Sequence, residues 1–175
     1  MGKESASGKV FDRKLKMGMV GGGPGAFIGD VHRKAARMDG QIELVAGAFD
    51  IDPAKSKEMG REQYIAPERA YDTYEDMLRE ESKLPEGERI DFVSVCVPNN
   101  YHFPIAKACL DAGFHIVCEK PMTMDLAEAK ELKKVVEQSG KVFALMHNYT
   151  GYPMVKLARD MVSQGELGDI IKIVV

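Results

Sequence analysis

The chain has 175 residues, of which 45% are hydrophobic and 29% are charged, and these values fit a globular domain with a substantial core. Its net charge is −3 and it contains no basic stripe, which argues against nucleic acid and anionic membranes as partners. The polar residues 1–14 lack the hydrophobic stretch of a secretory signal, and no apolar segment approaches the roughly 20 residues that cross a bilayer.

After a lead-in, residues 1–14, that we expect to be disordered, apolar runs alternate with helical patterns. The expected strands are Leu15–Val20, Ile42–Phe49, Ile90–Val97, His115–Cys118, Lys141–Met146 and Ile170–Val175. The expected helices are Asp30–Met38, Pro53–Met59, Tyr74–Glu80, Tyr101–Ala112, Leu126–Gln138 and Met154–Gln164. Short β-branched runs between helices predict a parallel sheet covered on both faces, and right-handed crossovers make it a doubly wound α/β fold of the Rossmann type.

The last residues predict the start of a second domain. Ile170–Val175 has the composition of a full strand, and a strand that follows a complete α/β unit usually opens a new domain. We therefore expect a dinucleotide-binding domain over 15–148, then a linking helix and the first strand of a substrate domain of α+β type, cut short, over 149–175. An exposed strand of this kind favours self-association into a homo-oligomer.

The cysteines and histidines do not form a metal-binding pattern. Cys96, Cys109 and Cys118 are odd in number and lack CxxC spacing, and two of them fall in apolar runs, so we expect buried structural thiols in a reducing, cytoplasmic setting. The four histidines are scattered along the chain, and we expect no metal site.

A glycine-rich segment, residues 20–29, lies between the first expected strand and the first expected helix. A strand that turns through glycines into a helix brings backbone N–H groups and a positive helix end to one point, which suits a phosphate or diphosphate. Gly21 and Gly23 fit the first two glycines of the G-x-G-x-x-G pattern. The third position is either Ala26, a tolerated variant, or Gly29, with five residues between it and Gly23.

Asp50 closes the second strand, where an acid binds a ribose 2′-hydroxyl in dinucleotide-binding folds. A carboxylate there repels a 2′-phosphate and so favours NAD over NADP. Two alternatives stay open: Asp50 could be a cap or turn residue in competition with Asp52, and the nearby Lys55 and Lys57 could admit NADP.

Two further segments follow strands at their carboxyl ends, where ligands lie in open α/β sheets. The first is 97–102, with the sequence Val-Pro-Asn-Asn-Tyr-His, in which Asn99 can cap a helix and His102 is more often structural. The second is 119–121, Glu-Lys-Pro, whose lysine could hydrogen-bond substrate and nicotinamide ribose, or could simply form a solvated pair with its neighbouring glutamate.

The order of these motifs, together with Ala-Gly-Phe-His at 112–115, resembles the glucose–fructose oxidoreductase/inositol dehydrogenase/MocA (Gfo/Idh/MocA) family. The resemblance implies a pyridine-nucleotide oxidoreductase acting on sugars, cyclitols or related polyols, with catalytic Lys120 beside the nicotinamide and the reacting hydroxyl. It further implies that Pro121 fixes the backbone, through a cis bond. The cofactor contacts it implies, together with the residues above, are Gly21, Gly23, Gly25, Ala26, Phe27, Ile28, Asp50, Val97, Pro98, Asn99, His102, Glu119, Lys120, Pro121 and Asn148.

In that family, residues of a second domain complete the proton relay and hold the sugar. We therefore expect this chain to bind NAD without turning over a polyol by itself. Two other hypotheses are kept: a non-catalytic NAD-binding sensor or partner module, and a structural α/β domain whose glycine turn binds nothing.

Overall fold

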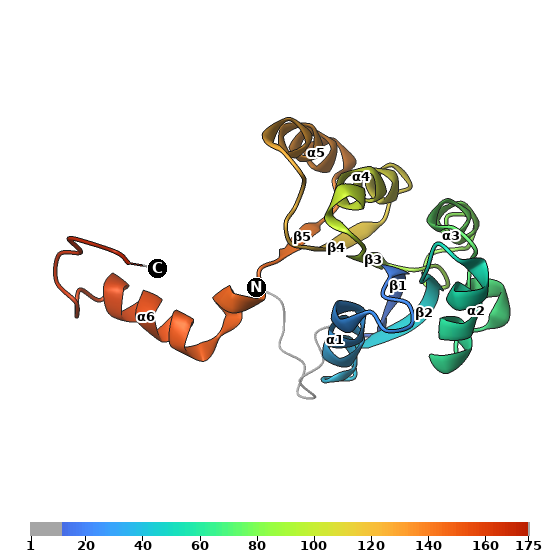
Figure 1. Cartoon of the computed structure of the whole chain (residues 1–175), viewed down its shortest axis with the longest axis horizontal. Coiled ribbons are helices and arrows are strands. Elements are labelled where there is room, and N and C mark those ends of the chain that lie inside the picture. The colour runs from blue at the N-terminus through green and yellow to red at the C-terminus, as the bar shows by residue number, and fades with distance from the viewer. Residues whose placement is uncertain (1–11, 175) are drawn as a thin grey trace. The chain divides into compact units, whose positions relative to one another are not determined.

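The computed structural model describes residues 12–174 (Figure 1). These residues form two compact units, one ending at Leu145 and the other beginning at Met146. The strands are β1 (Leu15–Gly21), β2 (Ile42–Ala48), β3 (Phe92–Cys96), β4 (His115–Glu119) and β5 (Phe143–Met146). The α-helices are α1 (Phe27–Arg37), α2 (Pro53–Glu62), α3 (Tyr74–Glu81), α4 (His102–Asp111), α5 (Leu126–Ser139) and α6 (Pro153–Ser163), and the 3₁₀ turns are η1 (Pro67–Arg69), η2 (Asn99–Tyr101) and η3 (Asn148–Gly151).

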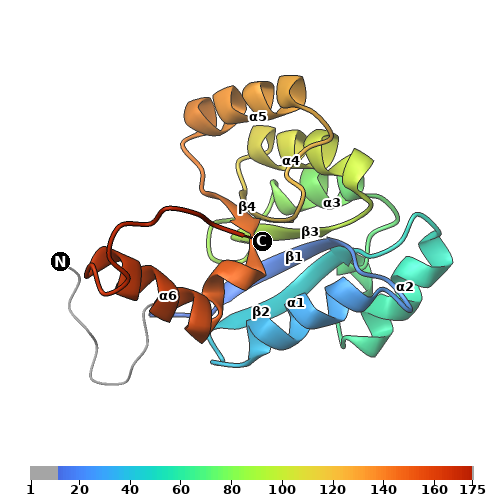
Figure 2. The same ribbon diagram turned by 60° about the vertical axis from the view of Figure 1, so that its left-hand side comes forward.

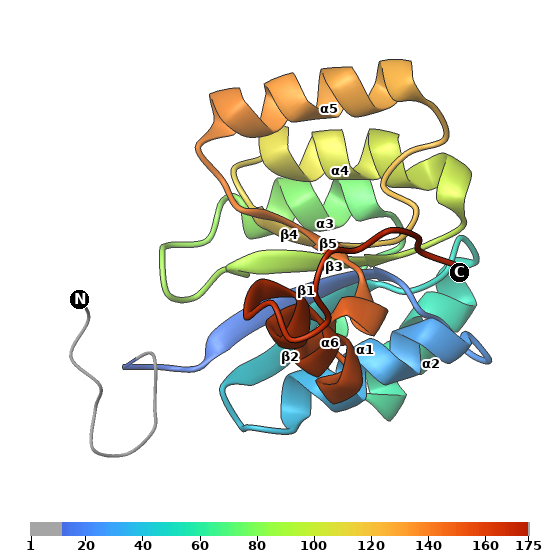
Figure 3. The ribbon, with the colours of Figure 1, turned by 90° about the vertical axis from the view of Figure 1, so that its left-hand side faces the viewer.

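The strands form one sheet in the order β2-β1-β3-β4-β5, and β1 pairs in parallel with both β2 and β3, as β3 does with β4. Figures 2 and 3 show α3, α4 and α5 on one face of the sheet and α1 and α2 on the other. This is the doubly wound Rossmann architecture that the alternating pattern predicts. The reversal of strand order falls between β1 and β3, so the carboxyl ends of these strands open a crevice for a ligand.

Each face of the sheet has its own hydrophobic core. On one face, Leu78 of α3, Leu110 of α4 and Leu132 of α5 belong to a single buried cluster. On the other, Ala36 of α1 and Met59 of α2 belong to a second cluster. Because both faces of the sheet are covered, the central strands β1 and β3 are buried at four consecutive positions each and do not alternate between buried and exposed residues.

Helix ends follow the local signals in the sequence. The Asp52 side chain caps α2 by accepting the N–H of Ala54 at 2.9 Å. At α5, Asp125 accepts the N–H of Glu128 at 2.9 Å, and Glu128 in return accepts the N–H of Met124 at 2.9 Å. Gly140 ends α5 in the left-handed conformation, with φ of 64°.

The prediction of a strand at Ile170–Val175 is wrong for its described residues, since 170–174 have no strand assignment. A strand needs a neighbouring strand to pair its N–H and C=O groups, and the described part of the second unit contains η3 and α6 instead. Val175 and most of the predicted lead-in, residues 1–11, lie outside the described residues. Arg13, within that lead-in, donates two 2.7 Å hydrogen bonds to Asp91.

Candidate functional site

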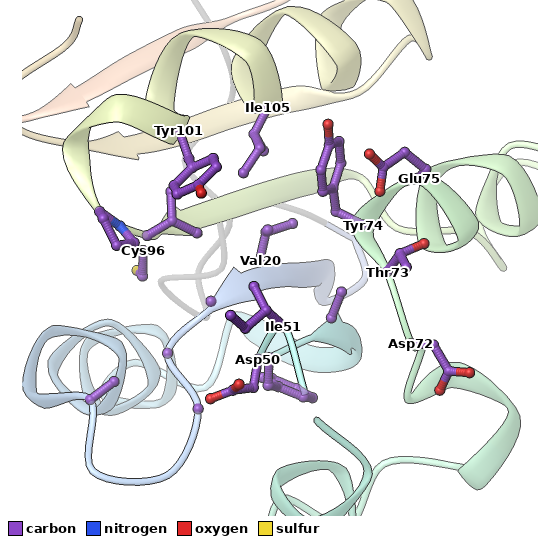
Figure 4. A pocket seen from close by; sticks show the side chains of 18 of the residues that line it. Val20, Asp50, Ile51, Asp72, Thr73, Tyr74, Glu75, Cys96, Tyr101 and Ile105 are labelled. Atoms are coloured by element: carbon purple, nitrogen blue, oxygen red, sulfur yellow. The ribbon is translucent and has the colours of Figure 1, made fainter. Parts of the chain in front are cut away.

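A cleft of about 580 Å³ lies at the carboxyl edge of β1, β2 and β3. Figure 4 shows its wall, which is formed by the glycine segment, the end of β2, the start of α3 and the segment after β3. The lining residues are Val20, Gly21, Gly22, Gly23, Pro24, Ala26, Ala48, Phe49, Asp50, Ile51, Asp72, Thr73, Tyr74, Glu75, Cys96, Val97, Pro98, Tyr101 and Ile105.

The glycine segment requires glycine at several positions for space. A Cβ on Gly21, whose φ is +79°, would lie 2.3 Å from the carbonyl oxygen of Cys96. A Cβ on Gly29 would lie 2.4 Å from Cα of Gly22. Gly29 therefore lets α1 pack directly against the turn, which is the role of the third glycine, and the three extra residues between Gly23 and Gly29 explain the irregular spacing. Ala26 instead lies at the N-cap of α1 and in the cleft wall.

The start of α1 is a suitable place for an anion. Its N-cap residue, Ala26, makes no side-chain cap hydrogen bond, so the amides of the first turn are not closed off by a capping side chain. Beneath the turn, the buried guanidinium of Arg33 donates to the carbonyl oxygen of Gly22 at 2.6 Å, and burial lowers the pKa of Arg33. The Arg33 guanidinium thus stabilises the turn through this hydrogen bond, although the sequence patterns did not single out Arg33.

Asp50 has one oxygen engaged and one directed at the glycine segment. Its Oδ1 accepts the N–H of Asp52 at 2.9 Å, and its Oδ2 lies 3.1 Å from the point that a Cβ on Gly23 would occupy (Figure 4). Because Asp52 caps α2, Asp50 is a turn residue and not the cap. Its second oxygen is directed at the glycine segment.

The other charges around the cleft bear on the choice between NAD and NADP. Lys57 forms a 2.8 Å ion pair with Asp72, which also lines the cleft. Three carboxylates, those of Asp50, Asp72 and Glu75, therefore border the cleft, and Lys57 is paired with that of Asp72. This charge distribution disfavours a 2′-phosphate.

Apolar and aromatic side chains form the rest of the wall. Val20, Ile105 and the rings of Tyr74 and Tyr101 surround the space in Figure 4, and Ile51 is 98% exposed at its rim. Burial raises the pKa of Tyr74 to about 12, so its hydroxyl is neutral at physiological pH. Such a surface suits a flat aromatic base with few polar contacts.

The segment after β3 divides into residues that line the cleft and one that supports it. Val97 and Pro98 line the cleft, whereas Asn99 is exposed and is not a lining residue. His102 is fully buried, with Nδ1 2.6 Å from the carbonyl oxygen of Pro121 and Nε2 3.0 Å from that of Val97. His102 thus joins the loops after β3 and β4, which is the structural role that its sequence position favours. The resemblance implies that His102 lines the cofactor cleft, but it is not among the residues that line the cleft.

The Glu-Lys-Pro segment ends β4 with one buried and two exposed residues. Glu119 is buried, with Oε1 2.9 Å from Nε2 of His32 and Oε2 accepting the N–H of Lys120 at 3.0 Å. The alternative of a solvated Glu–Lys pair is therefore wrong for Glu119. Lys120 is exposed, and its bond to Pro121 is cis, as the resemblance implies.

Four other predicted contacts are not among the residues that line the main cleft. Phe27 is 81% exposed beside a second cavity at the turn, which also includes Gly25. Ile28 packs against the core cluster beneath α1. Asn148 belongs to η3 in the second unit.

The cysteines are buried and free, as predicted. Burial raises the pKa of Cys96 to about 11 and that of Cys118 to about 12, so neither thiol is a nucleophile at neutral pH. Among residues 12–174, no group of three or more His, Cys, Asp or Glu side chains is arranged to hold a metal ion. Over the same range, no helix has both the length and the apolar character of a membrane span.

Comparison with known proteins connects this geometry to a family. Residues 15–147 match the family model GFO_IDH_MocA, described as an oxidoreductase family with an NAD-binding Rossmann fold. The uncharacterized oxidoreductase YfiI of Bacillus subtilis is 39% identical over 163 residues, which are 93% of this chain and 41% of YfiI. Levoglucosan dehydrogenase of Pseudarthrobacter phenanthrenivorans is 28% identical over 159 residues, or 91% of this chain and 40% of that enzyme.

A solved structure with a similar fold is the inositol dehydrogenase homolog from Azotobacter vinelandii complexed with NADH and myo-inositol. It is 41% identical, with a TM-score of 0.87, and the match covers 91% of this chain and 41% of that one. The chain thus spans about two fifths of the length of these relatives. On the family match over 15–147, the chain belongs to the Gfo/Idh/MocA oxidoreductase family and contains its NAD-binding Rossmann domain.

Proposed function

We propose that this chain holds NAD(H) for hydride transfer between a CH–OH group of a sugar, cyclitol or related polyol and the nicotinamide ring. The observation that carries the proposal is the cleft in which the glycine turn, the start of α1 and the second oxygen of Asp50 converge. The substrate class is supported by the relatives, one a levoglucosan dehydrogenase and another an inositol dehydrogenase homolog complexed with NADH and myo-inositol.

The chain's own groups would bind the cofactor in three places. Amides of the turn and of the first turn of α1 hold the diphosphate, and Asp50 accepts a hydrogen bond from the adenosine ribose. The apolar wall that includes Ile51 and Tyr74 takes the adenine. When bound, the nicotinamide supplies the hydride chemistry, and the protein supplies position and electrostatics.

Lys120 is the proposed catalytic residue. It follows β4, two strands from β1 and its glycine turn, on the same edge of the sheet. Its ammonium would hydrogen-bond the reacting hydroxyl and stabilise the negative charge that develops as the proton leaves. We expect this chain to bind NADH but to show no measurable polyol oxidation with NAD, because none of its described residues is assigned to the proton relay that the family resemblance places in a second domain.

NADH fluorescence titration of the chain tests the cofactor proposal. We expect saturable NADH binding that weakens at least about tenfold in Asp50→Ala, since a hydrogen bond to a charged group is worth about 1.5–3 kcal/mol. Glu137→Ala, an exposed change on α5, is the control and leaves binding unchanged. Absence of NADH binding by the unmodified chain would refute the proposal, and equal affinities of Asp50→Ala and the unmodified chain would refute the role of Asp50.

Preference for NAD is tested in the same titration with NADPH. We expect weaker binding of NADPH than of NADH, because the carboxylates of Asp50 and Asp72 border the cleft and would repel a 2′-phosphate. The Asp50→Ala chain should narrow that difference by losing NADH affinity and gaining NADPH affinity. Tighter binding of NADPH by the unmodified chain would contradict the preference.

A further inference from the structure

We propose that His32 is a positioning residue that fixes Lys120 relative to the glycine turn. His32 lies on α1 and is 8% exposed. Its Nδ1 is 2.8 Å from Oγ of Ser94 on β3, and its Nε2 is 2.9 Å from Oε1 of Glu119 on β4. One imidazole therefore connects the helix that follows the turn to two strands of the sheet.

Glu119 passes this connection on to Lys120. Glu119 is 7% exposed, and its carboxylate divides its oxygens between two donors, Nε2 of His32 and the backbone N–H of Lys120. Because a carboxylate accepts and does not donate, Nε2 of His32 is the donor in this contact. Without it, a buried carboxylate loses one of its donors, and it must rotate or admit water to replace that donor. Rotation of the carboxylate would break the contact of Oε2 with the Lys120 N–H and so release the backbone at Lys120.

The opposite end of the connection is the glycine turn. His32 shares α1 with Gly29, which packs on Gly22 of the turn, and with Arg33, which donates to the carbonyl oxygen of Gly22. The diphosphate site and Lys120 are thus attached to one another through α1, His32 and Glu119. The inference rests on the proposed function in one respect. A bound NADH would be held by its diphosphate at the glycine turn and would contact Lys120 at its nicotinamide end, so its affinity would depend on the distance between the turn and Lys120.

Two substitutions separate the two contacts of His32. The amide nitrogen of glutamine in His32→Gln can replace Nε2 and still donate to Glu119, whereas the shorter asparagine in His32→Asn reaches only toward Ser94. Lys34→Ala is the matched control on the same helix, since Lys34 is exposed and pairs with Asp30. Thermal melts of each chain verify folding, and His32→Phe, which keeps ring volume and removes both contacts, replaces His32→Asn if that chain does not fold.

Binding of NADH is compared with binding of ADP, which reaches the turn and the Asp50 side but has no nicotinamide. We expect His32→Asn to weaken NADH binding about tenfold and to change ADP binding by less than about twofold. His32→Gln and Lys34→Ala should bind both like the unmodified chain. The proposal would be overturned if His32→Asn lost NADH and ADP affinity equally. It would also be overturned if His32→Gln lost as much NADH affinity as His32→Asn.

A second measurement needs no nucleotide. In ¹⁵N-labelled, ligand-free chain, the Lys120 amide resonance should move in His32→Asn and stay in place in His32→Gln and Lys34→Ala, because the amide donates to Glu119. A Lys120 amide that does not move in His32→Asn would refute the role of His32 even if NADH binds. Failure of the unmodified chain to bind NADH would refute the proposed function and leave this measurement as the test of His32.

Discussion

Substituting Gly29 by alanine sets two physical effects against one another. Gly29 lies in the first turn of α1, where the better helix propensity of alanine would stabilise the chain by up to about 1 kcal/mol. The added Cβ would, however, lie 2.4 Å from Cα of Gly22, about 1 Å short of ordinary van der Waals contact, which begins at 3.4 Å. The obstacle is backbone and not a flexible side chain, so the turn and the helix must separate.

Overpacking of this kind costs about 1–3 kcal/mol, which exceeds the gain in propensity. We therefore expect Gly29→Ala to lower the free energy of unfolding by about 1–2 kcal/mol. Separation of the turn from α1 also moves the amides that would hold the diphosphate, so NADH affinity should fall about tenfold or more. Urea unfolding followed by circular dichroism measures the first effect, and NADH fluorescence titration measures the second.

Two other glycines provide matched controls. A Cβ at Gly25 would have no atom within 4 Å, but the φ of Gly25 is +77°. The effect of Gly25→Ala therefore reports backbone strain alone, which costs about 1–2 kcal/mol. Gly151→Ala has open space and no positive φ, so it should be neutral. If Gly29→Ala is as stable as the unmodified chain and binds NADH equally well, the proposed close packing of α1 on the turn is wrong.

Further predictions concern the thiols and the acid limb of stability. Burial raises the pKa of Cys96 to about 11 and that of Cys118 to about 12. Iodoacetamide at pH 8 should therefore label the folded chain far more slowly than the urea-unfolded chain. Equal labelling rates for the folded and unfolded chains would contradict the burial of these thiols. The hydrogen bond from Arg13 lowers the pKa of Asp91, so its contribution to stability is present above the ordinary value of 3.8 and is lost as pH falls through the lowered value. Arg13→Ala should reduce the pH dependence of the free energy of unfolding below pH 4. If that pH dependence is unchanged, the Arg13–Asp91 pair contributes nothing to stability.

The residues at strand ends are those for which sequence reasoning was most informative. The alternation of apolar runs and helical patterns predicted the Rossmann fold, and the carboxyl ends of parallel strands necessarily meet at one edge. The glycine turn, Asp50 and the Val97-Pro98 segment therefore line one cleft, as expected. This reasoning succeeds because it depends only on chain order and on a regular property of parallel sheets.

His32 and Arg33 were missed, although the sequence contained a signal for them. Gly29, His32, Arg33 and Ala36 have the spacing i, i+3, i+4, i+7 of one helix face, and all four are buried. Two polar side chains on the inward face of a helix require buried partners, which the pattern by itself does not name. The partners of His32 are Ser94 and Glu119, and the partner of Arg33 is the carbonyl oxygen of Gly22. Each partner is distant in sequence from the residue it contacts and becomes its neighbour only on folding.

The sequence by itself determined the order of strands and helices, the glycine turn, the acid after the second strand and the Glu-Lys-Pro strand end, because these depend on local composition and spacing. Only the tertiary structure decided that Gly29 and not Ala26 packs α1 on the turn, that His102 supports two loops, and that 170–174 form no strand. Each of these depends on which atoms meet across the fold, and a strand in particular exists only where a second strand completes its hydrogen bonds.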